Sequence, residues 1–161
     1  MVVSALSDTA LIEKADGIAE RAHRGQVDKI GRPYIAHPRR VAGRVDTAQA
    51  KAAALLHDVI EDSPVTAADL VAEGIPRAVV DCVILLTRRD DVPDADYYRA
   101  INAHPLARVV KMADLADNSD AARLAQIPEP KQSELRAKYR RAYTALGEPE
   151  RAAALCPKPS A

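Results

Sequence analysis

Apolar positions recur with a helical period along most of the chain, and no segment alternates convincingly with the period of two that marks a strand. Residues 47–62 give the strongest helix signal. A first helix is expected from Ser7 or Asp8 onward, with apolar positions at Leu11, Ile12, Ala15, Ile18, Ala19 and Ala22. Further helices are expected over residues 38–45, 63–74, 76–89, 90–104 after an initial loop, 105–127 with a turn or second helix at its end, and 133–146. The pattern predicts an all-α fold of about seven to eight helices.

Local signals support several of these boundaries. Ser7, Thr47 and Thr66 each precede an apolar run and can accept a hydrogen bond from the first turn of a helix. Pro38 suits a first helical turn, where its missing N–H costs nothing. Gly147 ends the last amphipathic segment, because glycine is the residue that most often terminates a helix.

The chain reads as one domain. Its 161 residues can bury a sizeable core but leave little room for a second one. Residues 24–34 contain two Gly and one Pro and are expected to form a loop. We assign residues 1–147 to the helical domain and expect residues 148–161 to be a loose C-terminal tail.

Composition narrows the classes of function. Ala dominates the apolar fraction and Phe and Trp are absent, which favours closely packed helices. The formal net charge is zero, which argues against general nucleic-acid binding while leaving room for a local basic pocket. The basic segment 136–143 has the form of a solvated amphipathic helix face, and we assign it no nucleic-acid role. Cys82 and Cys156 are expected to be free thiols in a reducing cytoplasm.

No membrane partner is expected, since no apolar run approaches the ~20 residues that a spanning helix needs. Nothing in the sequence indicates an oligomeric state.

The stretch LLHDVIED, residues 55–62, places one imidazole and three carboxylates at the end of an apolar run. His57 and Glu61 are four residues apart, as are Asp58 and Asp62, so each pair lies along one helix face. Burying like charges together is costly unless a positive charge lies among them. An imidazole beside a carboxylate is the start of a divalent metal site.

Two other segments offer further ligands. His37 stands directly before Pro38, and Asp114 lies in an otherwise apolar context. Together with His57 and Asp58 they provide two nitrogens and two carboxylates, a set that could bind one ion and leave a position open for water. For Asp114 alone, a buried salt bridge with Lys111 or Arg108 is the competing interpretation.

Glu61 and Asp62 lie one turn beyond these candidate ligands. A bound divalent ion lowers the pKa of water from ~15.7 toward ~7 in the best-known zinc case. The two carboxylates are placed to orient that water or to accept its proton.

These residues carry a resemblance to a known family. H…HDxxED…D, formed by His37, residues 57–62 and Asp114, resembles the HD-superfamily phosphohydrolase domain, and more narrowly the hydrolase domain of the RelA/SpoT family and the small stand-alone alarmone hydrolases. AHRGQVDKIGRPYIAHPRRVA (22–42) resembles AHxGQxRKSGxPYIxHPxxVA, AALLHDVIEDSPVT (53–66) resembles AALLHDVVEDTxxT, and VVKMADLADN (109–118) resembles IKLADRLHN. The similarity extends from about residue 8 to residue 124.

The resemblance implies an all-helical HD domain with one Mn²⁺ that removes the 3′-pyrophosphate from guanosine tetra- and pentaphosphate. By position, the metal ligands are His37, His57, Asp58 and Asp114, the catalytic pair is Glu61 and Asp62, and the substrate contacts are Lys29 and Asn118. Zn²⁺ and Fe²⁺ also suit a set of two His and two Asp. We expect a stand-alone cytoplasmic hydrolase with a nucleotide substrate.

Four departures from the family pattern lie in or near the segments that contact the nucleotide. Asp28 replaces an Arg, Ile30 a Ser, Asp117 a His and Ala121 a Thr. A carboxylate in place of a guanidinium reverses the charge and removes a forked donor. Two alternatives therefore stay open: hydrolysis of a different phosphorylated nucleotide or dinucleotide cofactor, and a non-catalytic nucleotide-binding module that keeps its metal.

Overall fold

The computed structural model describes residues 6–157, and this part of the chain is all-α, as the apolar pattern predicts. Its only pairing of extended backbone is an isolated bridge between Val27 and Pro33. The helices are α1 (Asp8–Ala22), α2 (Ala36–Ala42), α3 (Ala48–Leu56), α4 (Val59–Asp62), α5 (Ala67–Ala72), α6 (Arg77–Leu86), α7 (Asp94–Asn102), α8 (Pro105–Asn118), α9 (Ala121–Leu124), α10 (Lys131–Ala145) and α11 (Pro149–Ala154). None of these helices is long and apolar enough to cross a membrane.

The expected N-terminal caps are present. Ser7 Oγ accepts a hydrogen bond from the Ala10 N–H (3.2 Å), and Thr47 Oγ1 accepts one from the Ala50 N–H (3.1 Å). Thr66 and Asp69 form a complete capping box at the start of α5. The capping residues thus fix three helix starts where the sequence predicts them.

The helices in the described part outnumber the seven or eight expected, because two long segments are each divided into two helices and the expected tail contains α11. Residues 47–62 form α3 and α4, with His57 and Asp58 in the turn between them. His57 Nδ1 bonds to the Ala54 carbonyl oxygen (2.6 Å), a backbone group of the last turn of α3. The break directs both side chains toward one point, which a continuous helix would not do for adjacent residues.

The bounds of α2 differ from the sequence expectation. Helix α2 spans Ala36–Ala42 rather than 38–45, and Lys51 Nζ donates to the Ala42 and Val45 carbonyl oxygens (3.2 and 2.7 Å) just after it. This ammonium satisfies carbonyls at a helix C-terminus, where a positive charge is favourable. The second helix expected at the end of residues 105–127 is present: α8 ends at Asn118 and the short α9 follows.

The loose tail expected for residues 148–161 is wrong for its first part. Residues 149–154 form α11, which packs against α10 with Ala152 and Leu155 buried. Arg108 of α8 donates to Glu148 (2.8 Å) and to the Leu146 carbonyl oxygen (3.1 Å), which ties this end of the chain to the domain. Residues 158–161 lie outside the described part.

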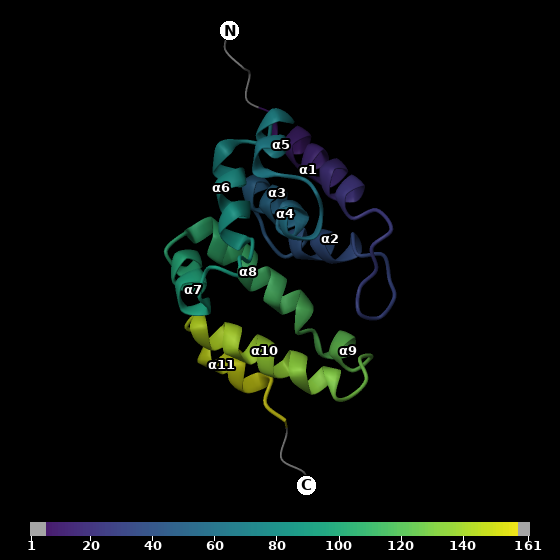
Figure 1. Cartoon of the computed structure of the whole chain (residues 1–161), viewed down its shortest axis with the longest axis vertical. Coiled ribbons are helices and arrows are strands. Elements are labelled where there is room, and N and C mark those ends of the chain that lie inside the picture. Colours follow the sequence, from purple (N-terminus) through teal and green to yellow (C-terminus); the bar gives the residue numbers. More distant parts are fainter. Residues whose placement is uncertain (1–5, 158–161) are drawn as a thin grey trace.

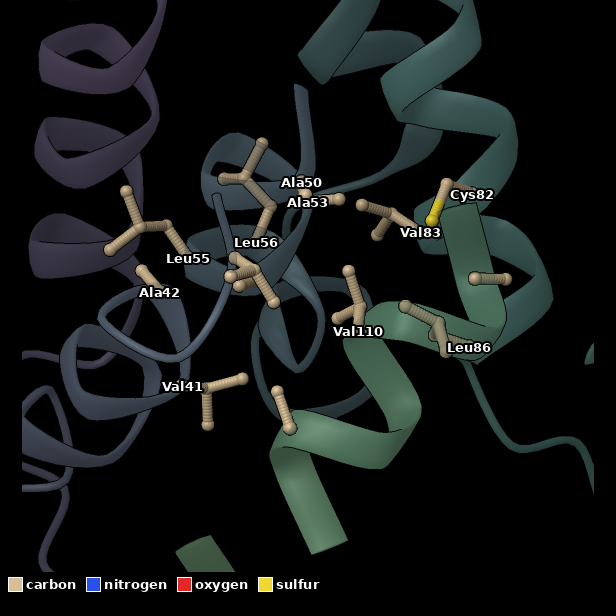
Figure 2. Close-up of a cluster of buried hydrophobic side chains, with 14 of the residues drawn as sticks. Val41, Ala42, Ala50, Ala53, Leu55, Leu56, Cys82, Val83, Leu86 and Val110 are labelled. Atoms are coloured by element: carbon tan, nitrogen blue, oxygen red, sulfur yellow. The ribbon is translucent and has the colours of Figure 1, made fainter. Parts of the chain in front are cut away.

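Helix α3 is the centre of the core. It contacts α1, α2, α6 and α8, and its Ala52, Ala53 and Ala54 are fully buried. Figure 2 shows Leu56 and Ala53 of α3 facing Val83 of α6 and Val110 of α8. Small residues on α3 allow these helices to approach closely, which compensates for the absence of Phe and Trp.

A second layer lies below this core. In Figure 1, α10 and α11 run beneath α8, with α7 and α9 beside the two ends of α10. Contacts of α10 with α7 and α8 join the two layers. The α1–α2 loop descends toward α9 on the same side (Figure 1), and an ion pair between Asp28 and Arg123 links these two segments.

Candidate metal centre and active site

A cavity of about 360 Å³ lies between the two layers. Its walls come from the α1–α2 loop, the His57–Asp62 segment, the α6–α7 connection, α8 and α10. All eight residues singled out from the sequence line this one cavity: Lys29, His37, His57, Asp58, Glu61, Asp62, Asp114 and Asn118.

The four proposed metal ligands converge on a common point. His37 Nε2 lies 3.1 Å from Asp114 Oδ1 and 3.8 Å from Asp58 Oδ2. His57 Nε2 lies 3.0 Å from Asp58 Oδ2 and 3.4 Å from Asp114 Oδ1. Ligand atoms of His37, His57 and Asp58 all fall within 4.8 Å of one another, a spacing that one ion can bridge.

Both imidazoles are oriented for ligation through Nε2. His37 Nδ1 bonds to Asp117 Oδ2 (2.7 Å) and His57 Nδ1 bonds to the Ala54 carbonyl oxygen (2.6 Å). Both partners are acceptors, so in the neutral imidazole each Nδ1 carries the proton and each Nε2 presents a lone pair to the centre.

The residues fit a divalent ion. His57 Nε2 is buried and has no hydrogen-bond partner among the described residues. Two lone pairs and two carboxylates facing one another are unfavourable unless a positive charge joins them. A divalent cation meets this requirement, and a donor set of nitrogens and oxygens is one that such ions prefer.

The pKa shifts of Asp58, Asp114 and His57 also indicate that positive charge is favourable at this centre. Burial acts to raise the pKa of Asp58 and Asp114, but His57 beside Asp58 and Lys111 beside Asp114 outweigh it and hold both pKa values below their usual range. Burial acts to lower the pKa of His57, yet the charge of Asp58 raises it well above normal. The centre therefore keeps both acids ionised and attracts a cation.

Neighbouring groups fix the two carboxylates. Tyr34 donates a hydrogen bond to Asp58 Oδ2. Lys111 Nζ donates to Asp114 Oδ2 (2.9 Å), and Asn118 Nδ2 donates to Asp114 Oδ1 (2.8 Å). The salt bridge considered for Asp114 thus exists with Lys111, but it involves one oxygen and leaves Oδ1 facing the imidazoles. Tyr34 was missed as a site residue, although it stands in the YIAHP segment.

Glu61 and Asp62 lie beside Asp58, and ligand atoms of the three carboxylates fall within 4.8 Å of one another. Glu61 Oε1 accepts a hydrogen bond from the Arg88 backbone N–H (2.6 Å), which orients it. Burial and the nearby charge of Asp58 raise the pKa of Asp62, and burial also raises that of Glu61. A carboxylate with a raised pKa is the better proton acceptor near neutral pH.

The loop that carries Lys29 is organised by Asp28. Asp28 Oδ1 accepts hydrogen bonds from the N–H groups of Ile30 (3.0 Å) and Arg32 (2.9 Å), and Arg123 of α9 lies 3.3 Å from Oδ2. Burial acts to raise the pKa of Asp28, but these bonds lower it overall. The acidic residue in place of the family's Arg is therefore paired with a guanidinium, and both groups line the cavity.

Asp117 requires a correction to its expected position beside the nucleotide. It is fully buried and is absent from the cavity wall. Its carboxylate instead accepts hydrogen bonds from His37 Nδ1 (2.7 Å) and from Arg40 Nε and Nη2 (2.8 and 3.0 Å). It orients a candidate ligand from behind, a role that no sequence signal indicated because its partners lie some 80 positions away.

Of the other two departures from the family pattern, Ile30 is part of the cavity wall and Ala121 is not. Ile30 lines the cavity, as its place in the loop suggests. Ala121 is exposed at the start of α9 and is not part of the cavity wall.

Comparisons with curated proteins find relatives over part of the chain. A segment of 60 residues, 35% of this chain, is 48% identical to a guanosine-3′,5′-bis(diphosphate) 3′-pyrophosphohydrolase of Haemophilus influenzae and covers 9% of that protein. A segment of 120 residues, 66% of this chain, is 35% identical to a GTP pyrophosphokinase of Streptomyces coelicolor and covers 14% of it. The chain thus matches about a tenth of the length of these relatives. No family model matches the chain.

A solved structure shares the fold across nearly the full length. It is described as a metazoan ortholog of SpoT that hydrolyzes ppGpp, and it matches with a TM-score of 0.73 and 20% identity over 94% of this chain and 96% of that one. The partial sequence similarity, together with the shared fold, shows that the chain resembles the hydrolase domain of RelA/SpoT-type proteins.

Proposed function

We propose that this chain is a metal-dependent phosphohydrolase that removes the 3′-pyrophosphate from guanosine 3′,5′-bis(diphosphate) or a closely related nucleotide. The observation that carries the proposal is that Nε2 of His37 and Nε2 of His57 each lie within 3.8 Å of a carboxylate oxygen of Asp58 and of Asp114. Glu61 and Asp62 lie beside Asp58 in the same cavity, whose wall also carries basic side chains. The relatives named guanosine-3′,5′-bis(diphosphate) 3′-pyrophosphohydrolase suggest the substrate.

We propose that His37, His57, Asp58 and Asp114 hold one Mn²⁺. When bound, such an ion lowers the pKa of water and neutralises charge on a phosphoryl oxygen. The choice of manganese comes from the family resemblance, since the same ligand types suit Zn²⁺ and Fe²⁺.

The chain's own residues then have distinct roles. Glu61 and Asp62 orient the attacking water and accept its proton, and their raised pKa values suit that task. Water attacks the phosphorus attached to the 3′ oxygen. The bond from phosphorus to that oxygen breaks, and the nucleoside leaves as a 3′-hydroxyl after taking up a proton.

Positive side chains stabilise the charge on the phosphate groups. Lys29 lines the cavity from the α1–α2 loop and is exposed to solvent there, so its ammonium can contact a phosphate. Asn118 lines the same cavity while its amide holds Asp114, so its proposed contact with substrate comes in addition to a positioning role.

The proposal does not specify which base the substrate nucleotide carries. Asp28 and Arg123 present a neutral, hydrogen-bonding pair in the cavity wall where the family pattern has an arginine. A panel should therefore contain guanosine 3′,5′-bis(diphosphate), its adenosine counterpart and a phosphorylated dinucleotide cofactor.

The experiment is product analysis with the manganese-loaded chain. We expect inorganic pyrophosphate and a nucleoside 5′-diphosphate, and a fall in kcat of about 100-fold or more for Glu61→Gln and Asp62→Asn. Glu134→Gln serves as the matched control, because Glu134 is exposed on α10 and pairs only with Lys131. Equal turnover by all four proteins would remove the acidic pair from the mechanism.

A non-catalytic nucleotide-binding module is the competing function. It predicts that nucleotide raises the melting temperature while no product forms above a protein-free control. A cytoplasmic location also stays a prediction, based on the thiols of Cys82 and Cys156, which are both free.

A further inference from the structure

Five cationic side chains line the cavity, and they differ in their partners. They are Lys29, Arg88, Lys111, Arg123 and Lys138. Lys111 pairs with Asp114, Arg123 with Asp28, and Arg88 with Asp94. Lys29 and Lys138 have no carboxylate within ion-pair distance among residues 6–157.

Lys138 comes from a segment that the sequence predicts to be a solvated helix face. In the structure, α10 instead forms one wall of the cavity. Tyr139, the next residue, is buried and lines the same cavity, and Leu135 is buried one turn earlier. These contacts fix the turn of α10 that carries Lys138, while the lysine itself stays accessible to a ligand.

Lys29 and Lys138 line the same cavity as Lys111. Burial lowers the pKa of Lys138, and the charges of Lys29 and Lys111 lower it further. Like charges gathered from the α1–α2 loop, α8 and α10 repel one another unless an anion is placed between them.

We propose that Lys138, together with Lys29, forms a second anion subsite that binds a phosphate group of the substrate other than the one attacked. This inference rests on the proposed function and narrows its substrate to nucleotides that carry phosphate groups at two positions. Lys138 is then a specificity-determining residue, since a substrate with phosphate at the reacting position alone gains nothing from it.

Kinetics on two substrates test the proposal. The manganese-loaded chain is assayed on guanosine 3′,5′-bis(diphosphate) and on guanosine 3′-diphosphate with a free 5′-hydroxyl. We expect Lys138→Ala to raise KM for the first substrate about tenfold more than for the second, equivalent to about 1.4 kcal/mol. Lys138→Arg keeps the charge and should restore most of the affinity. Lys131→Ala, an exposed lysine of the same helix outside the cavity, is the matched control.

A binding measurement separates this subsite from the proposed reaction. Guanosine and adenosine 5′-diphosphates carry only the second phosphate group and are not substrates of the proposed hydrolysis. Calorimetry with the metal-loaded chain should show binding that Lys138→Ala weakens about tenfold and that Lys131→Ala leaves within about twofold. If the wild type were catalytically inactive, the proposed function would be wrong. The binding measurement would still show whether Lys138 contributes to an anion subsite.

Three results would overturn the subsite. They are equal losses by Lys138→Ala on both substrates, an unchanged affinity of that variant for the 5′-diphosphates, and no binding of either 5′-diphosphate by the wild-type chain.

Discussion

Asp117→Asn is the substitution that most directly tests how the candidate metal centre is held. The side chain keeps its size, and the site is fully buried, so the change acts on hydrogen bonds and charge rather than on packing. Asp117 Oδ2 accepts from His37 Nδ1, and Oδ1 accepts from Arg40 Nε. An asparagine has one oxygen and one NH₂ group, so one of these two donors must face another donor.

Either orientation of the new amide is unfavourable. If the NH₂ group faces His37, it favours the tautomer with the proton on Nε2, which removes the lone pair from the centre. If it faces Arg40, the guanidinium loses its best acceptor, and His37 loses a charged partner that makes it a stronger ligand. Loss of such a supporting group typically weakens metal binding about 10- to 100-fold, or about 1.4 to 2.8 kcal/mol.

The assay is calorimetric titration of the metal-free chain with Mn²⁺, accompanied by thermal unfolding to establish that each variant folds. Arg40→Gln keeps a donor to the Asp117 carboxylate and should change metal affinity less than about threefold. Asp81→Asn removes a carboxylate that pairs with Arg77 on α6 and is not part of the cavity wall, and it serves as the control. The reasoning fails if a folded Asp117→Asn protein binds Mn²⁺ as tightly as the wild type, or if Arg40→Gln loses as much.

The remaining predictions concern stability. A chelator should lower the melting temperature of the metal-loaded chain by about 5–10 °C, because metal at 100 times its Kd adds about 2.7 kcal/mol, and a chelator without effect would argue against a bound ion. In the metal-free chain, folding raises the pKa of Glu61, so folding disfavours the ionised carboxylate. Glu61→Gln removes this cost and should raise the melting temperature near pH 7. Below about pH 4 the carboxyl group is protonated in both states, and the variant and wild type should melt at the same temperature. Leu56→Ala should cost about 2–5 kcal/mol by urea unfolding, since Leu56 is fully buried at the centre of the core. Thr66→Ala should cost about 1 kcal/mol, because it removes the capping box of α5.

Elements with local signals were predictable. The starts of α1, α3 and α5 follow from Ser7, Thr47 and Thr66, whose side chains bond to backbone groups within three residues. The apolar period gave the fold class and most helices. These features depend on neighbours in the sequence, and so the sequence alone determines them.

Features that depend on distant partners were not predictable. The amphipathic, polar pattern of its helix predicts a solvated face for Lys138. In the structure Lys138 lines the cavity with Lys29 and Lys111, which come from other segments of the chain. Asp117 replaces a histidine of the family pattern in or near a nucleotide-recognition segment, but its side chain points away from Asn118 and bonds to His37. The sequence gives the residue types of Lys138 and Asp117, but it does not show which distant residues lie beside them in the fold.

The break between α3 and α4 shows how local and distant constraints combine. Ala48–Leu56 has every feature of a helix that could continue, and the sequence predicts one helix through Asp62. A continuous helix would separate the adjacent side chains of His57 and Asp58 by about 100° around its axis, because it has 3.6 residues per turn. The observed turn instead brings His57 Nε2 to 3.0 Å from Asp58 Oδ2. Nε2 of His37 and Nε2 of His57 then each lie within 3.8 Å of a carboxylate oxygen of Asp58 and of Asp114. Helix α4 places Glu61 and Asp62 beside Asp58. The turn at His57 and Asp58 interrupts the helix where two side chains belong to the proposed metal site and not to the apolar core. The apolar pattern records only which positions pack in the core, so it could not predict this turn.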